Sequence, residues 1–434
     1  MSRARGAARP LDRQARPGRD RQARPARDRP ARSGRAKSPA WAKLLIAFGT
    51  VLSLVSFGTI VTEKMLTAAA TSGFKNSNLL GSAGNQQAVH HVEINGPLNV
   101  LLMGIDERPD QPGTDPSRSD SIIVLHIPAA HDKAYLISIP RDSYVHIPPN
   151  PATHYGGGHD KINSAYAIGS TNGQGREGGA RLLAATVKEL TGTGFDAAVI
   201  VNFGGFQDLV SALGGVSMCV DERTVSVHIG HDRNGRTGTP YDQSSGHPVL
   251  IRGMTPQVYE VGCRTFAAWE ALDYVRQREL LPDGDYGRQR HQQQFLKAVF
   301  SQALSRGVVG DPGKLKKVLD AAGQALTLDI GGVGIDDWLY SLRSIGTSDL
   351  VTIRTNAGQF TNRTVNGQSV EDLTDDTMQL LHSTATDTVD AFLATHQGWI
   401  IDGTASIASG SATPQSTANP PATTKPAKPK STGR

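Results

Sequence analysis

The sequence predicts an α/β fold, a mixed central sheet flanked by helices on both faces (α/β/α), preceded by one transmembrane helix. Short apolar runs bounded by Gly, Pro or Asp recur along the chain, as expected of buried strands. Segments with apolar residues three and four positions apart follow several of these runs, and that spacing is typical of helices with one buried face. Strands that alternate with such helices form a sheet that the helices cover. An uncharged run of 19 residues near the N-terminus predicts the membrane span.

The N-terminal tail, residues 1–40, is strongly basic, although the chain of 434 residues has a formal net charge of only +5. The tail holds thirteen basic residues against three Asp, a charge of +10, which leaves −5 for the remainder of the chain. A segment of Arg, Pro, Ala and Gly without large apolar residues cannot bury a core. We therefore expect this tail to be disordered.

The apolar run Leu44–Thr62 forms most of a predicted transmembrane helix, 41–62. At 1.5 Å per residue the run spans about 28 Å, close to the thickness of the hydrocarbon core of a bilayer. It is longer than the core of a secretory signal and follows a long tail, so we expect an uncleaved single-pass anchor in the cell membrane. The positive-inside rule places residues 1–40 in the cytoplasm and the remaining chain outside. The small polar residues of 63–95 are expected to be an extracytoplasmic linker.

The two cysteines, Cys219 and Cys263, both fall in the part expected outside the membrane. An even pair of cysteines in an oxidising compartment most simply forms one disulfide. Neither has a second cysteine at the C-x-x-C spacing of zinc sites, so a metal site is not expected. Two free buried thiols are the alternative.

The folded domain is expected to cover 96–402, followed by a disordered tail, 403–434, that is rich in Ser, Thr, Ala and Pro. The segment 148–175 is rich in Pro, Gly, Asn and His and is predicted to be a long loop. The segment 223–260 shows no clear periodicity. Strands are expected at 99–104, 121–127, 134–139, 197–203 and 350–354, and helices at 176–191, 206–213, 266–275, from Arg288 through Leu304, at 313–326, 335–345 and 373–395.

The stretch Tyr274–Gln294 concentrates arginines around one turn. Arg276 and Arg278 follow an apolar helical pattern, and Arg288 and Arg290 begin the next helix after a Pro-Asp-Gly turn. A helix N-terminus attracts anions, and a guanidinium group can hold two phosphate oxygens at once. The stretch therefore favours a clamp for a polyanion such as a diphosphate. The alternative is a solvated surface on which neighbouring acidic residues pair with the arginines.

Two aspartates lie at strand boundaries, Asp106 at the end of the first predicted strand and Asp120 just before the second. If these strands pair antiparallel, both carboxylates reach one edge of the sheet. Two carboxylates, a diphosphate and water molecules would form a Mg²⁺ site, in which Mn²⁺ is also possible. Arg118 and Arg141 lie beside the same expected edge. Ordinary surface or capping aspartates are the alternative.

Several common catalytic motifs are absent from the sequence: a Walker pattern, a G-x-S-x-G elbow and a His-Glu-x-x-His helix. His228 and His231 lie three residues apart, without acidic or cysteine companions, and are not expected to bind a metal. The apolar residues Phe206, Leu209, Val210 and Leu213 share one helical face, which packs in the core or lines a lipid pocket.

Seven motifs in one order make the chain resemble the LytR-CpsA-Psr family of cell-wall glycopolymer transferases. The resemblance covers residues 96–305 and continues more weakly to about residue 400. The motifs lie at Asn99–Asp106, Ser117–Ser121, Ile139–Asp142, Lys161–Tyr166, Gly205–Val216, Val275–Arg278, and Asp285–Arg288 with the glutamines after it.

The resemblance implies an anchored extracytoplasmic α/β/α enzyme that moves a glycopolymer from a polyprenyl diphosphate carrier to a peptidoglycan hydroxyl. The implied partners are the lipid-linked glycan, peptidoglycan and the cytoplasmic membrane, and no nucleic acid. The Arg-, Ala- and Gly-rich composition suggests an actinomycete, where arabinogalactan and teichoic acid are candidate polymers. The implied magnesium ligands are Asp106 and Asp120; the diphosphate contacts are Arg118, Arg141, Arg276, Arg278 and Arg288, with Lys161 and Gln292; the prenyl chain would lie along Phe206, Leu209, Val210 and Leu213.

One position departs from the family pattern, because His291 stands where many members have arginine. The neighbouring Arg290 points elsewhere on a helix, so neither residue is assigned to the site. Two other functions remain open. A diphosphatase would use the same clamp with water as the acceptor, and a membrane-bound regulator of envelope genes would use the basic tail.

The predicted topology can be tested on intact cells. A protease added outside should digest the chain after Thr62 and leave the basic tail intact, because the membrane shields the cytoplasmic side. Epitopes placed in the tail and in the expected linker report the two outcomes on immunoblots. A digested tail together with a protected outer domain would reverse the orientation.

Overall fold

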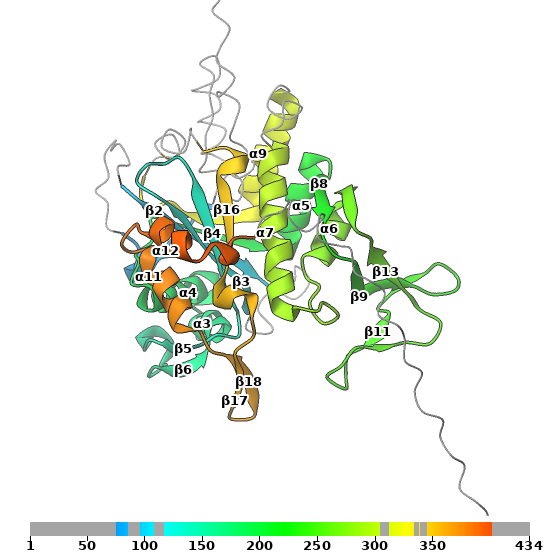
Figure 1. The fold of residues 1–434 in the computed structure, drawn as a ribbon, viewed down its shortest axis with the longest axis horizontal. Coiled ribbons are helices and arrows are strands. Elements are labelled where there is room, and N and C mark those ends of the chain that lie inside the picture. Colours follow the sequence, from blue (N-terminus) through cyan, green and yellow to red (C-terminus); the bar gives the residue numbers. More distant parts are fainter. Residues whose placement is uncertain are drawn as a thin grey trace, which may run out of the picture. The chain divides into compact units, whose positions relative to one another are not determined.

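The computed structural model describes residues 75–85, 96–107, 117–303, 312–333, 338 and 345–401 (Figure 1). The predicted membrane span and both predicted disordered tails lie outside these residues. Within the described residues, no helix has both the length and the apolar character needed to cross a membrane.

A mixed sheet of seven described strands forms the centre of the domain. Its central strand, β2, pairs antiparallel with β3 on one side and parallel with β7 on the other. β4 and β16 extend the sheet beyond β3, and β15 and β1 extend it beyond β7. The strands, in spatial order, are β1 (Lys75–Asn76), β15 (Leu326–Asp329), β7 (Ala197–Asn202), β2 (Leu98–Ile105), β3 (Ser119–Ile127), β4 (Ala134–Ile139) and β16 (Leu350–Arg354).

Helices cover both faces of this sheet, as the sequence predicts (Figure 1). Alternate residues of β2 belong to different cores: Val100 and Leu102 face one group of helices, and Leu101 and Met103 face the other. Both faces of the strand are therefore buried, which explains its continuous apolar sequence. The first group is α5 (Phe203–Leu213), α6 (Ala268–Tyr274), α7 (Gly284–Ala303) and α9 (Pro312–Ala325); the second is α3 (Ile162–Gly169), α4 (Gly175–Thr191), α11 (Asp375–Ser383) and α12 (Val389–Thr395).

The boundaries of α5 follow from its sequence. The Asn202 side chain accepts a hydrogen bond from the Gly205 backbone N–H at 2.9 Å, which caps the first turn. Gly214, with φ of 77°, ends the helix in the left-handed conformation. Gly205 also permits close packing on α9, because a Cβ atom there would lie 2.3 Å from the carbonyl oxygen of Ala325.

Several elements differ from the sequence prediction. The expected loop 148–175 contains helix α3 and strand β6 (Gly158–Lys161), which pairs with β5 (Tyr144–Ile147) just before the segment. Its Pro and Gly residues are concentrated on either side of α3, so the intervening Ile162, Ala165 and Tyr166 are free to pack in the core. The single helix expected at 373–395 is two helices, and the end of the helix expected at 313–326 leads directly into strand β15.

The ordered domain also begins before residue 96, inside the expected linker. Leu79 and Leu80 are buried, and their backbone N–H groups donate to Oδ2 of Asp329 at 2.8 and 3.0 Å. Together with β1 these residues close the edge of the sheet beside β15. Most of the helix expected at 335–345 lies outside the described residues.

A β-rich arm between α5 and α6 occupies the segment without clear periodicity (Figure 1). Its base is the antiparallel pair β8–β14, where Cys219 lies opposite Cys263 and the two are joined in a disulfide. The predicted pairing is therefore present in the structure. The arm consists of β8 (Val216–Val220), β9 (Thr224–His231), β10 (Thr237–Gly238), β11 (Tyr241–Asp242), β12 (Val249–Leu250), β13 (Thr255–Tyr259) and β14 (Gly262–Phe266), and a separate hairpin is formed by β17 (Asn362–Val365) and β18 (Gln368–Glu371).

Replacing Cys219 with Ser should lower the free energy of unfolding by about 2–5 kcal/mol, because the bridge restricts the unfolded chain. Cys263→Ser and the double variant should show the same loss, since each removes the same link. Urea unfolding of the oxidised protein measures the change, with reduced wild type as a control that should match the variants. Variants as stable as oxidised wild type would refute this contribution.

Candidate active site

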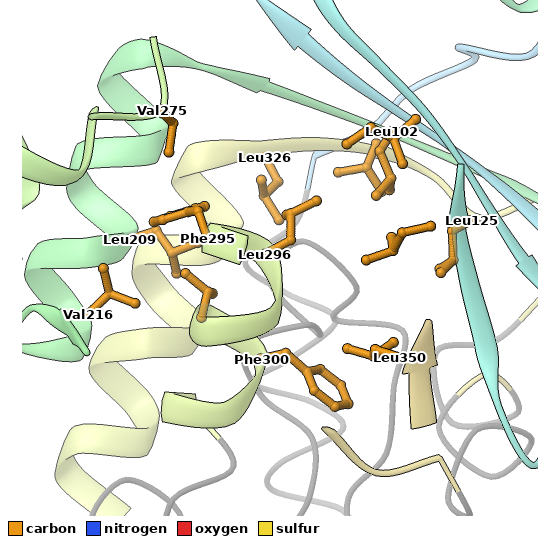
Figure 2. Packing of buried hydrophobic residues seen from close by; sticks show 14 of the residues in the cluster. Leu102, Leu125, Leu209, Val216, Val275, Phe295, Leu296, Phe300, Leu326 and Leu350 are labelled. Atoms are coloured by element: carbon orange, nitrogen blue, oxygen red, sulfur yellow. The ribbon is translucent and has the colours of Figure 1, made fainter. Parts of the chain in front are cut away.

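A cavity of about 340 Å³ lies between the sheet and the helices α5, α6 and α7. Its lining is apolar where it meets the interior and charged where β2 and β3 reach the sheet edge. Figure 2 shows the packing of the hydrophobic core on this face of the sheet; among its labelled residues, Leu102 on the sheet and Leu209, Phe295 and Leu296 on the helices also line the cavity. The polar part of the lining consists of Asp106, Asp120, Ser121, Arg141, Asn202, His228, Gln243, Arg276, Arg278, Glu279, Arg288 and Gln292.

Two of the four predicted lipid-contacting residues line this cavity. Phe206 stacks on Phe295 with ring centroids 4.2 Å apart, and Leu209 lies beside them. Val210 and Leu213 are also buried, but they pack in the core and are not part of the lining. Val210 is turned about 100° from Leu209 around the helix, and Leu213 lies about one turn further along it, away from the cavity lining.

Both predicted aspartates lie at the charged end of the cavity. Asp106 follows β2, and Asp120 belongs to β3 at a bulge, because Gly104 pairs with Ser121 while Ile105 pairs with Ser119. Asp120 is the extra residue in this register, and bulges typically redirect such a side chain. The antiparallel pairing expected from the sequence thus brings the two carboxylates to one edge.

The carboxylate of Asp106 is available to bind another group. Its Oδ1 atom is buried and has no hydrogen-bond partner among the described residues. A buried carboxylate oxygen without a partner is costly, so it fits a ligand that supplies positive charge or a donor. Carboxylate oxygens are suitable Mg²⁺ ligands. No cluster of three or more His, Cys, Asp or Glu side chains suited to a metal occurs in the described part of the chain, so a metal here would need oxygens from substrate and water.

Arg288 on α7 is the most deeply buried charged residue of the site, with 5% of its side chain exposed. It donates from Nη2 to the backbone carbonyl of Asp120 at 3.0 Å and pairs with Asp285 at 2.7 Å. Its Nε has no partner among the described residues. Burial lowers the pKa of Arg288, although Asp285 opposes this effect. The guanidinium group therefore has donor capacity left for an anion.

Arg141, which follows β4, holds Asp120 in place. Its Nη1 donates to Oδ1 of Asp120 at 2.6 Å, and its Nε lies 3.6 Å from Asp142. Burial lowers the pKa of Arg141, but Asp120, Asp142 and Asp285 together raise it more, so the pKa is raised overall. The pair leaves the second oxygen of Asp120 for a further ligand.

Lys161 does not line the cavity; it contacts Asp142, which lies beside Arg141. Its Nζ lies 2.9 Å from Oδ1 of Asp142. Burial raises the pKa of Asp142, but the hydrogen bond from Lys161 and the charge of Arg141 lower it more, so the pKa is lowered overall. Lys161 thus supports Arg141 through this carboxylate.

Arg276 and Arg278 lie in the connection between α6 and α7 and both line the cavity. The guanidinium carbon of Arg276 lies 4.4 Å from the centroid of the Phe203 ring, and no carboxylate pairs with it among the described residues. Arg278 donates from Nε to Glu279 at 3.0 Å. Burial raises the pKa of Glu279, but Arg278 lowers it more, so the pKa is lowered overall. Arg276 is thus the arginine with most of its donors available.

Three further residues lie outside the lining of the cavity: Arg118, which the resemblance assigns to the site, and Arg290 and His291, which were not assigned to it. The side chain of Arg118 is exposed, and its backbone carbonyl accepts from the Asp106 N–H at 3.2 Å. Arg290 pairs with acidic residues at the base of the arm, at 2.8 Å in the case of Asp221. His291 is buried against the Tyr274 ring, and burial lowers its pKa to about 3. The departure from the family pattern at position 291 therefore does not place a group in the cavity.

Sequence reasoning missed His228 and Gln243, which the arm brings to the charged end of the cavity. It also missed Asn202 and Phe203 at the junction of β7 and α5. The histidine had been considered only as a metal ligand, and no periodicity marked the arm as part of the site. The sequence predicts a strand through Phe203; Asn202 does end β7, whereas Phe203 already begins α5.

The chain is similar in sequence to proteins of one known family. The model of the LytR_cpsA_psr family matches residues 64–386. The chain is 32% identical over 233 residues to a polyisoprenyl-teichoic acid–peptidoglycan teichoic acid transferase TagU of Oceanobacillus iheyensis, covering 54% of this chain and 59% of that protein. It is 28% identical over 319 residues to the cell wall biosynthesis protein LcpA of Corynebacterium glutamicum, covering 66% of this chain and 54% of that protein.

These first two relatives are thus matched over less than two thirds of their own length. Among solved structures, protein gbs0355 of Streptococcus agalactiae superposes with a TM-score of 0.51. The match has 22% sequence identity and covers 68% of this chain and 88% of that one. This likeness supports the mixed α/β fold.

Asp142→Asn should lower the free energy of unfolding by about 1–2 kcal/mol at neutral pH, because it removes the charged acceptor of Lys161. The folded-state pKa of Asp142 is lowered, so its contribution is present above the ordinary aspartate pKa of about 3.9 and is lost as pH falls through the folded-state pKa. The difference from wild type should therefore shrink towards acid pH.

Urea unfolding at a series of pH values measures this difference. The control is Asp208→Asn, which changes an exposed carboxylate on α5 without an ion pair among the described residues. It should leave stability unchanged at every pH. A constant gap between wild type and Asp142→Asn down to acid pH would show that the charge of Asp142 is not what stabilises the fold.

Proposed function

Because the chain belongs to the LytR-CpsA-Psr family, we propose that it is a phosphotransferase that moves a glycopolymer from a polyprenyl diphosphate carrier to a peptidoglycan hydroxyl. The observation that carries the proposal is the division of one cavity into an apolar interior and a charged end. A polyprenyl diphosphate has the same division, with a long hydrocarbon chain joined to a diphosphate. The names of the relatives, which refer to polyisoprenyl-linked teichoic acid and cell wall biosynthesis, support the same substrate class.

The apolar interior would hold the prenyl chain. Phe206, Leu209 and Phe295 offer it a continuous hydrocarbon surface from two helices, opposite Leu102 of the sheet. Each methylene group removed from water contributes about 0.8 kcal/mol to binding. The hydrophobic effect is not directional, so this part of the cavity would select a chain of suitable thickness rather than a particular polymer.

The charged end would hold the diphosphate. Arg276 has no ion pair among the described residues, and Arg288 has an unpartnered Nε, so both have donors for phosphate oxygens. Arg278 and Gln292 lie in the same lining. Such donors stabilise the negative charge that moves onto the departing phosphate in the transition state.

A magnesium ion fits the two carboxylates of this end and completes the proposal. Asp106 and Asp120 would hold it, with Mn²⁺ as a possible substitute, and the buried Oδ1 of Asp106 that lacks a partner is the supporting observation. Such an ion would neutralise charge on the diphosphate. Arg141 would keep Asp120 oriented towards the ion through the hydrogen bond at 2.6 Å.

The reaction would form one phosphorus–oxygen bond and break another. The acceptor hydroxyl attacks the phosphorus that carries the glycopolymer, and the bond from this phosphorus to the polyprenyl phosphate breaks. The hydroxyl proton is released, polyprenyl phosphate leaves, and the glycan is linked to peptidoglycan by a phosphodiester. We place this reaction outside the cytoplasmic membrane, with the run Leu44–Thr62 as the anchor.

Replacing Arg276 with Ala, or Asp106 with Asn, should lower kcat at least about 100-fold, because each change removes charge that the transition state requires. Arg276→Lys should recover only part of the rate, since an ammonium group lacks the bidentate geometry. EDTA should reduce the wild-type rate to a similar extent. The control is Arg223→Ala on the arm, whose exposed guanidinium pairs with Glu260 at 3.3 Å and lies outside the cavity.

The assay combines the purified full-length protein, a polyprenyl diphosphate-linked glycan and a peptidoglycan acceptor, with products identified by mass spectrometry. The expected product is a glycan–peptidoglycan phosphodiester that forms only when the acceptor is present. Equal release of glycan phosphate without the acceptor would identify a diphosphatase instead. Wild-type rates in Arg276→Ala and Asp106→Asn would reject the proposed site.

A further inference from the structure

One histidine, His228, lines the charged end of the cavity, and the family resemblance assigns it no role. It comes from β9 of the arm, outside the motifs that carry the resemblance. Its side chain is 26% exposed, so the ring is partly open to the cavity and partly held by protein. Its protein contacts are made at Nδ1, which lies 3.0 Å from Nε2 of Gln277 and 3.6 Å from Oδ1 of Asp273.

The chemistry around Gln277 determines which way its amide points. The amide is buried, and its Oε1 accepts a hydrogen bond from the Val227 N–H at 3.0 Å. Its Nε2 lies 2.8 Å from both the carbonyl oxygen and Oδ1 of Asp273. If the amide were reversed, its oxygen would face the carboxylate of Asp273, acceptor against acceptor. Its NH₂ group would face the N–H of Val227, donor against donor. The NH₂ group therefore faces Asp273 and His228.

The side chain of Asp273 is also held by hydrogen bonds, so the orientations of Gln277 and His228 are restricted. Its two carboxylate oxygens accept from Ser226 Oγ at 2.9 Å and from the Tyr259 hydroxyl at 2.7 Å. Ser226 Oγ in turn accepts from the backbone N–H of His228 at 3.1 Å. A fully connected buried network of this kind holds its members in one arrangement.

The amide of Gln277 sets the tautomer of the neutral His228 ring. Nδ1 lies 3.0 Å from an amide nitrogen, which cannot accept a hydrogen bond, and 3.6 Å from Oδ1 of Asp273, which is too far for one. A proton on Nδ1 would therefore have no acceptor, so the proton of the neutral ring is on Nε2. Nε2 has no partner among the described residues, and it is the ring nitrogen left for a bound molecule. In this tautomer Nε2 can donate a hydrogen bond but cannot accept a proton.

We propose that His228 is a further substrate-contacting residue, which donates a hydrogen bond from Nε2 to a phosphate oxygen of the lipid-linked donor, and that Gln277 positions it. The inference rests on the proposed function and deepens it. The arginines of the site supply charge, whereas His228 supplies a donor of fixed direction from the arm. A donor that is already oriented loses no freedom when the substrate binds.

The first test replaces His228 with Phe, which keeps a ring but removes the donor, and with Gln, which restores a donor that cannot take up a proton. His228→Phe should lower kcat/KM in the transfer assay by about 10- to 100-fold, the range for a hydrogen bond to a charged acceptor. His228→Gln should recover most of that loss. The matched control is His231→Phe, on the same strand but outside the cavity lining, which should act like wild type.

The outcomes distinguish a His228 side chain that donates a hydrogen bond from one that accepts a proton as a base. Recovery by Gln supports the donor, whereas equal losses in the Phe and Gln variants would overturn it and point to proton transfer at His228. Wild-type rates in His228→Phe would reject any contact with the substrate. If the wild-type protein itself forms no product, the proposed function fails rather than the assignment of the tautomer.

The second test needs no activity. In ¹⁵N spectra of histidine-labelled full-length protein, at a pH where the ring is neutral, His228 should show a protonated Nε2 and an unprotonated Nδ1. Gln277→Met removes the donor to Nδ1, so the opposite tautomer should gain population by donating to Asp273. The same variant should lower kcat/KM in the direction of His228→Phe. A wild-type ring protonated at Nδ1 would overturn the role of Gln277. This measurement is made on the wild-type protein, so it does not depend on whether the Gln277→Met variant folds.

Discussion

The antiparallel pairing of β2 and β3, with its bulge at Asp120, is the constraint on which the site depends. It places Asp106 and Asp120 at one edge of the sheet, although fourteen positions separate them in the chain. The bulge needs a close approach of the two strands, because a Cβ atom at Gly104 would lie 2.9 Å from that of Ser121. Arg141 and Arg288 are then positioned by bonds to Asp120, one through its side chain and one through its backbone.

The two faces of the sheet serve different purposes. Towards α3 and α4 the helices pack closely on each other, because a Cβ atom at Gly179 would lie 2.8 Å from the carbonyl oxygen of Tyr166. Towards α5 and α7 lies a core as well (Figure 2), and the cavity with its charged end adjoins it. An apolar cavity that opens towards charged groups is suited to a ligand with a hydrocarbon part and an anionic part, in line with the proposed function.

The sequence predicted the parts of the fold that follow from local patterns. The strands around Asp106 and Asp120, the helix closed by Gly214, and the disulfide were all recognisable from periodicity, turn residues and compartment. Helix α3 was missed because its short apolar stretch lies within a segment dominated by Pro and Gly. Strand β15 was missed because its four residues continue an apolar helical pattern without a break.

The part of the site formed by arginines that are close in sequence was predictable, whereas the part that involves the arm was not. Arg276, Arg278 and Arg288 lie within thirteen residues, so their spacing pointed to one ligand. His228 and Gln277 are 49 residues apart, and only the pairing of β9 with β13 and the packing of α6 bring them together. Contacts of that kind depend on tertiary structure, which no local pattern encodes.

The most direct test of this account is a crystal structure of the protein with a short-chain polyprenyl diphosphate and Mn²⁺, whose anomalous signal locates the ion. The account predicts the ion between Asp106 and Asp120, the diphosphate within hydrogen-bond distance of Arg276 and Arg288, and the prenyl chain beside Phe206 and Leu209. A lipid bound outside this cavity, or an ion held by other residues, would contradict it.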